Sequence, residues 1–210
     1  MTALAPWLTR FERARAAALR GDAEALHQVR VIARRLRVWL ALAGLHVLQG
    51  DLRWLCRETS ALRDLDVLGE VLTAEGRATL RPPAVRRARA ALESSRVDGV
   101  VAALRVLPAL DVTRARAVLR AFEARLDVLR AQTDDELHAL RRQVRRARYA
   151  REWLEEDIAE LRHLQAVLGP LADLAALRRL VTSRTQPRPL PRRTRGARRG
   201  SSGAARSAPW

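Results

Sequence analysis

The stretch LHQVRVIARRLRVWL, residues 26–40, decides the fold class. Its apolar residues recur every three or four positions, which is the spacing of one face of an α-helix. At about 100° per residue, Val29, Ile32 and Leu36 fall on one side of that helix. The other side carries His27, Arg30, Arg34 and Arg37, with Arg35 on its flank. The stretch therefore predicts a helix that has a core-facing side and a basic side.

The same pattern, H-x-x-R-x-x-x-R-R-x-R, occurs again further along the chain. Its second copy consists of His138, Arg141, Arg145, Arg146 and Arg148, with Arg142 on its flank. A second block also repeats, because LRWL at residues 52–55 is matched by LRHL at residues 161–164. Repetition of two linked blocks in the same order predicts a duplicated helical bundle with pseudo-two-fold symmetry.

The rest of the chain before residue 182 also reads as helix. Leu, Ala, Arg and Glu dominate it, and no segment alternates apolar and polar residues over the length of a strand. Caps and helix breakers predict helices over residues 4–20, 23–43, 52–72, 82–94, 99–107, 112–131, 133–155, 157–168 and 170–181. We expect an all-α domain over residues 1–181, with repeat one at about 4–94 and repeat two at about 99–181.

Residues 182–210 differ in composition from everything before them. This segment holds eight Arg residues, no acidic residue and many Pro, Ser and Gly residues. Such a composition cannot bury a core, so we expect a disordered basic tail.

The charge balance predicts an anionic partner. The 210 residues include 40 basic residues, all of them Arg, against 23 acidic residues, for a net charge of +17. The single Cys excludes an intramolecular disulfide and a thiolate metal cluster. No apolar run is long enough to span a membrane, and the N-terminus lacks signal-peptide features, so we expect a cytoplasmic protein.

Neither copy of the basic pattern contains an acidic residue that could balance its arginines. Each copy of the pattern forms a basic row along one side of its helix. Unpaired like charges one helical turn apart repel, so a bound anion would stabilise each basic row. The Leu-rich helices add Arg53, Arg57 and Arg162 as further candidate ligands. No phosphate-binding glycine loop and no paired carboxylates accompany the arginines, so we expect no catalytic residue, no metal and no cofactor.

Four blocks together resemble the CHAD domain, the histidine-bearing α-helical domain family. They are LHQVRVIARRLRVWL, DLRWLCRETSALRDLDVL, ELHALRRQVRRARYAREWL and AELRHLQAVLGPLADLAAL. The resemblance implies two helical bundles whose basic faces converge on a central groove or pore. It also implies binding of inorganic polyphosphate and possible location at polyphosphate granules. The implied ligands are His27, Arg30, Arg34, Arg35, Arg37, Arg53, Arg57, His138, Arg141, Arg145, Arg146, Arg148 and Arg162, and the helix geometry adds Arg142.

Two other functions remain open at this point. A nucleic-acid-binding protein would explain the charge, and the basic tail could hold nucleic acid weakly and without sequence preference. The basic rows, however, have few of the aromatic residues on which unpaired bases stack. An enzyme acting on polyphosphate through His27 or His138 is the third hypothesis, and it lacks a metal site.

Overall fold

The computed structural model describes residues 3–67, 73–126 and 133–170. Within these ranges the chain is helical, without strands, which confirms the all-α prediction. The helices are α1 (Ala5–Leu19), α2 (Ala23–Leu42), α3 (Val47–Glu58), α4 (Ser60–Val67), α5 (Ala74–Leu92), α6 (Ser95–Arg105), α7 (Val112–Glu123) and α8 (Asp134–Leu154). Residues 159–170 form a further helix after α8. Residues 182–210, the predicted tail, lie outside the described residues.

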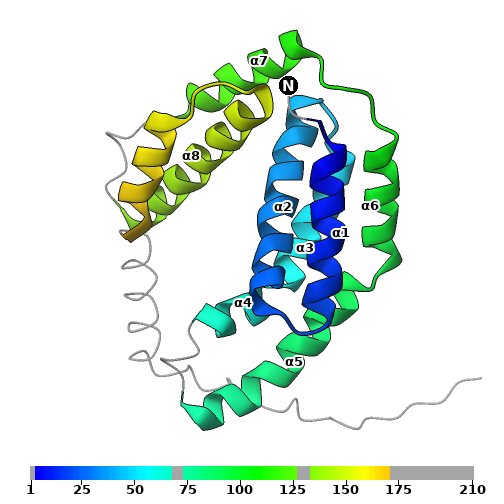
Figure 1. Ribbon diagram of the computed structural model, residues 1–210. Coiled ribbons are helices and arrows are strands. Elements are labelled where there is room, and N and C mark those ends of the chain that lie inside the picture. The colour runs from blue at the N-terminus through cyan, green and yellow to red at the C-terminus, as the bar shows by residue number, and fades with distance from the viewer. Residues whose placement is uncertain (1–2, 68–72, 127–132, 171–210) are drawn as a thin grey trace, which may run out of the picture.

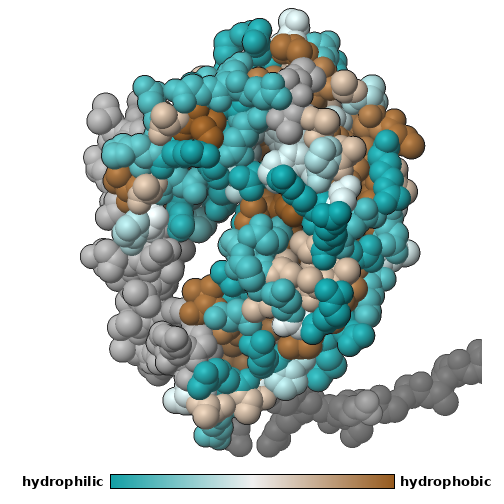
Figure 2. Space-filling view, viewed as in Figure 1, coloured by the Kyte–Doolittle hydropathy of each residue, from teal (hydrophilic) through white to brown (hydrophobic). Residues whose placement is uncertain are grey.

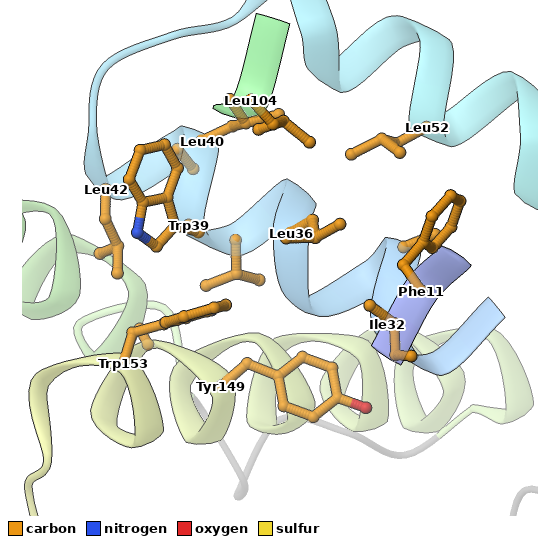
Figure 3. Packing of buried hydrophobic residues seen from close by; sticks show 14 of the residues in the cluster. Phe11, Ile32, Leu36, Trp39, Leu40, Leu42, Leu52, Leu104, Tyr149 and Trp153 are labelled. Carbon is orange, nitrogen blue, oxygen red and sulfur yellow. The ribbon is translucent and has the colours of Figure 1, made fainter. Parts of the chain in front are cut away.

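The helix predicted from residues 26–40 is at the centre of the molecule. In Figure 1, α2 lies beside α1 and α3, and it packs most extensively against these two helices. The predicted core side of α2 is fully enclosed, with Val29, Ile32 and Leu36 each at most 4% exposed. Phe11 of α1 and Leu52 of α3 complete this part of the core (Figure 3). Burial of this apolar stripe fixes which side of α2 is left for the arginines.

The α8 helix joins the core through two aromatic residues. Tyr149 and Trp153 are buried and lie against the α2 side chains (Figure 3). The indole Nε1 of Trp153 donates a hydrogen bond of 3.0 Å to the backbone carbonyl of Arg35. Together with α7, α8 forms the upper left part of the molecule in Figure 1. Figure 2 shows the surface hollowed between this part and the body that contains α2.

Three predicted helices differ clearly from those in the structure, and one of them, expected over residues 112–131, already ends at Glu123. The helix expected over residues 52–72 begins earlier, at Val47, and is interrupted at Thr59, where α3 ends and α4 begins. The helix expected to begin at Pro82 begins at Ala74 instead, and Pro82 and Pro83 lie inside it. The Thr73 side chain accepts a hydrogen bond of 3.1 Å from the Gly76 amide and caps this start. The Thr73 cap, and not the proline pair, therefore sets where this helix begins.

The start of α8 was predicted correctly. Thr133 and Glu136 form a reciprocal capping box, in which each side chain accepts a hydrogen bond from the other residue's backbone amide. In the second half α7 precedes α8 as α1 precedes α2, and the 159–170 helix follows α8 as α3 follows α2. The pseudo-two-fold symmetry itself stays a prediction.

Candidate polyanion site

A basic pocket of about 340 Å³ lies between α2, α3 and α8. Arginines supply more than half of its lining, and among the described residues no carboxylate lines it. The lining arginines are Arg34 and Arg37 from α2, Arg53 from α3, and Arg142, Arg145 and Arg146 from α8. All six were candidate ligands from the sequence. The structure therefore brings arginines from both copies of the basic pattern to one pocket.

Arg34 and Arg37 are the least satisfied members of the pocket. The Nε atom of each is buried, and neither Nε has a hydrogen-bond partner among the described residues. A buried donor without a partner costs roughly 1–3 kcal/mol, and more when the group is charged. Native structures rarely leave such groups unpaired unless a ligand, ion or water completes them. An anion in the pocket would satisfy these donors.

Mutual repulsion and burial act together on the charges of the pocket. The pKa of Arg145 is lowered to about 10, first by burial and then by the neighbouring charge of Arg34. Burial also lowers the pKa of Arg37 and of Arg146. The guanidinium of Arg146 lies over the ring of Phe122, with its Cζ 3.9 Å from the ring centroid. The pocket therefore concentrates positive charge, and none of the described residues that line it is a carboxylate that could neutralise this charge.

Two predicted ligands, Arg35 and Arg148, lie outside the pocket lining. Both are paired with Glu152 of α8: Arg35 through Nε at 3.1 Å and Arg148 through Nη1 at 2.5 Å. Arg148 also donates to the Gln165 side chain at 2.9 Å. The sequence predicts no acidic partner for either row, and for these two residues that prediction is wrong. Glu152 was missed because it follows the second basic pattern and reaches back across the interface to α2.

Arg30 and Arg57 also have partners within the protein. The Nη1 group of Arg30 donates to the Cys56 carbonyl and, at 3.0 Å, to the Thr59 hydroxyl. Arg30 therefore holds the point where α3 ends, and burial lowers its pKa. Arg57 is exposed and pairs with Glu58 at 3.3 Å. Neither residue lines the pocket.

The remaining four predicted ligands do not line the pocket. His27 is half-buried on α2, and its pKa is lowered by burial and then by the charge of Arg63. His138 is exposed and Arg141 is half-buried, both on α8. Arg162 is exposed on the 159–170 helix. The structure thus places six of the fourteen predicted ligands in the pocket itself.

Sequence reasoning missed the neutral part of the lining, which includes Gln49, Gln143 and Tyr149. Gln143 could have been found, because it lies between Arg142 and Arg145 in the second row. Gln49 could not have been found, since it lies before the helix predicted over residues 52–72. Its amide Nε2 donates to the Leu45 carbonyl at 3.2 Å, which fixes it at the edge of the pocket.

The part of the chain that the structure describes has neither a cluster of metal-ligating side chains nor a membrane-spanning helix. Residues 3–67, 73–126 and 133–170 contain no group of three or more His, Cys, Asp or Glu side chains arranged to hold a metal ion. Over the same ranges, every helix is too short or too polar to cross a bilayer.

Comparison with known proteins identifies the family. A family model described as the CHAD domain matches residues 2–182. The chain belongs to the CHAD domain family. A solved CHAD domain, from the plant Ricinus communis, has 25% sequence identity and a TM-score of 0.62. That match covers 84% of this chain and 74% of the plant chain. No curated protein matches this CHAD chain significantly.

Proposed function

We propose that this protein binds inorganic polyphosphate through the pocket between α2, α3 and α8, without catalysing a reaction. The observation that carries the proposal is the unneutralised charge of the pocket. Six arginines converge there, no described carboxylate lines it, and two buried Nε donors are unpaired. Arginine grips phosphate oxygens with a planar fork of donors, so each guanidinium can hold two oxygens of a chain.

The neutral lining favours polyphosphate over nucleic acid. Tyr149 is the aromatic residue of the pocket, and it is only 4% exposed, so its ring faces are not open for base stacking. The pocket is also concave, whereas duplex DNA is read by a helix that protrudes into a groove. A linear polyanion without bases fits such a lining best. A cellular location at polyphosphate granules would follow from this affinity.

A binding role without catalysis is the simpler one for this lining. Guanidinium groups hold phosphate oxygens, but breaking a phosphoanhydride bond also needs an activated nucleophile, commonly with a metal ion. Glu152, which contacts both basic rows, is occupied by Arg35 and Arg148. We therefore expect no phosphate release when the purified protein is incubated with polyphosphate and magnesium.

The test is competition of labelled polyphosphate against DNA and RNA at physiological salt, with two double variants. Replacing Arg34 and Arg37 by Gln should lower polyphosphate affinity a hundredfold or more, since charge-assisted bonds contribute roughly 1.5–3 kcal/mol each. The matched control replaces Arg77 and Arg86, which are exposed on α5 and do not line the pocket.

The control should change the affinity less than twofold. An equal loss from both double variants would mean that net charge alone governs binding, and the pocket would then have no special role. DNA or RNA that displaces polyphosphate at equal concentration of charge would favour a general polyanion binder instead.

A further inference from the structure

The helix α5, at the lower end of the described part of the molecule in Figure 1, has two apolar sides. Its buried residues, among them Ala88 and Leu92, pack into the fold. At about 100° per residue, Ala78, Pro82 and Val85 fall together on an adjacent side. These three residues line a shallow groove of about 530 Å³, and Val85 is 39% exposed there. No described residue covers this apolar stripe.

Arginines border the groove on both sides. By the same helical geometry, Arg77 and Arg81 lie on one side of the stripe and Arg86 lies on the other. Arg81 is paired with Asp66 at 2.8 Å. Arg77 and Arg86 are exposed, and neither has a carboxylate partner among the described residues. The groove therefore combines an apolar floor with two positive charges that are available to a partner.

The groove continues into a more enclosed pocket further along α5. This pocket has a volume of about 260 Å³ and lies between α4, α5 and the turn that joins α1 to α2. Arg81 and Val85 line both hollows, so the two are adjacent. Leu26, Leu62 and Leu92 belong to the apolar lining of the pocket. An apolar side chain of a bound helix fits this pocket while the rest of that helix lies along the groove.

The carboxylates of this pocket are engaged within the protein. Asp66 is held by Arg81, and the Asp22 side chain accepts a hydrogen bond of 2.9 Å from the Ala25 amide. Arg20, which also lines the pocket, is exposed and has no carboxylate partner among the described residues. The charge available to a partner at the pocket is therefore positive, as it is along the groove.

We infer that α5 docks an amphipathic helix of another protein, in which acidic residues flank a row of apolar ones. A second copy of this chain, bound through the same face, would set arginines against arginines. Residues 182–210 contain eight Arg and no acidic residue, so their charge does not match either. Polyphosphate has no apolar surface with which to cover the stripe. This inference goes beyond the proposed function and does not depend on it.

The experiment titrates the full chain with a synthetic amphipathic helix of about 18 residues, or five turns, with leucines on one face and glutamates beside them. Two matched peptides carry Lys in place of Glu, or Ser in place of Leu. Only the acidic peptide with its leucines should bind, because the groove needs both charge and apolar contact. A photoreactive side chain at Ala78 should cross-link to that peptide.

Two variants of the groove should weaken binding of the acidic peptide. Val85→Ser should lower the affinity about fivefold, because it removes apolar surface that the docked helix buries. Arg77→Gln with Arg86→Gln should lower it about five- to tenfold, through loss of two charge contacts at exposed positions. Both of these arginines are exposed, so this second variant tests the groove even if Val85→Ser does not fold.

Matched controls lie outside the groove. Leu80→Ser changes an exposed apolar residue on another side of α5. Arg13→Gln with Arg120→Gln removes two exposed charges from α1 and α7. Both controls should leave the peptide affinity unchanged, and so should the pocket variant Arg34→Gln with Arg37→Gln.

Several results would overturn the inference. They are no binding of the acidic peptide, equal binding of either matched peptide, and losses in the controls or the pocket variant equal to those in the groove variants. Cross-links from position 78 to residues 171–210 of the same chain, or to a second copy, would also overturn it. Failure of polyphosphate binding would leave the peptide result standing, so the two proposals fail separately.

Discussion

Arg37 and Arg148 occupy the same position in the two copies of the basic pattern, but their surroundings differ. Arg37 lines the pocket with a buried, unpaired Nε, whereas Arg148 is held by Glu152 and Gln165. Two positions earlier the roles of the copies are exchanged. Arg35 of the first copy is ion-paired, and its counterpart in the second copy, Arg146, lines the pocket. One difference explains much of this. Four residues after Arg148 stands Glu152, and four residues after Arg37 stands Ala41. A repeated pattern therefore does not imply a repeated role.

The largest difference in polyphosphate affinity is expected between two single variants, Arg37→Gln and Arg148→Gln. Arg37→Gln should weaken polyphosphate binding about tenfold or more, because it removes a charge that no described carboxylate pairs and that the ligand would pair. The folded state should be as stable as before or more so. Arg148→Gln should leave affinity within twofold and lower stability by about 1 kcal/mol, through loss of its bonds within the protein. Titration with polyphosphate measures the affinity of each variant, and urea denaturation measures its stability. Equal losses of affinity would make the two copies functionally alike.

Replacement of Glu152, the acidic residue that has no counterpart in the first copy, should mainly affect the stability of the fold. Glu152→Gln leaves Arg35 and Arg148 without a counter-charge in a cluster whose side chains are 12–20% exposed. We expect a loss of about 2 kcal/mol, between the values for exposed and fully buried ion pairs. Polyphosphate affinity should stay the same or rise slightly, since a negative charge beside the site is removed. Urea denaturation measures the first effect, and a large fall in affinity would contradict the second.

These contrasts show what could be predicted from sequence. The periodicity of residues 26–40 predicted the buried side of α2, and so it predicted that Arg34 and Arg37 lie on the other side. Positions within one helix follow from geometry. Partners from a distant helix do not, so the pairing of Arg35 with Glu152, across more than a hundred residues, could not be predicted. The same holds for Arg30, whose partner carbonyl belongs to a helix end at Thr59 that no breaker in the sequence marks.

Arg30 offers a smaller test of the first copy. Its guanidinium holds the carbonyl of Cys56 and the hydroxyl of Thr59, where α3 ends. Arg30→Gln should lower stability by about 1–2 kcal/mol, as expected for the loss of charge-assisted bonds to a helix C-terminus. The loss of polyphosphate affinity should be much smaller than that of Arg37→Gln. Thermal unfolding with and without ligand separates the two effects. An affinity loss equal to that of Arg37→Gln would make Arg30 a ligand.

The smallest expected effect is the pH dependence of His27. Burial and the charge of Arg63 lower its pKa below the usual 6.5, so in the free protein it is mostly neutral at neutral pH. Because the unfolded chain binds the proton more readily, stability should be complete above pH 6.5 and decline as pH falls below it. A bound anion raises this pKa, so affinity should increase up to about threefold in the same interval. His27→Gln should remove that increase. If the affinity of this variant still rose as the pH fell, His27 would be excluded as the source of the pH dependence.

The arginine-only lining of the pocket has a consequence for its chemical reactivity. The protein has no Lys, so no side chain carries a primary amine. Acetyl transfer, which neutralises lysine-based anion sites, has no target among the six lining guanidinium groups. Reagents that acylate amines should leave ligand binding intact, whereas dicarbonyl reagents that modify guanidinium groups should abolish it. Acetylation of a lysine amine therefore cannot regulate this pocket.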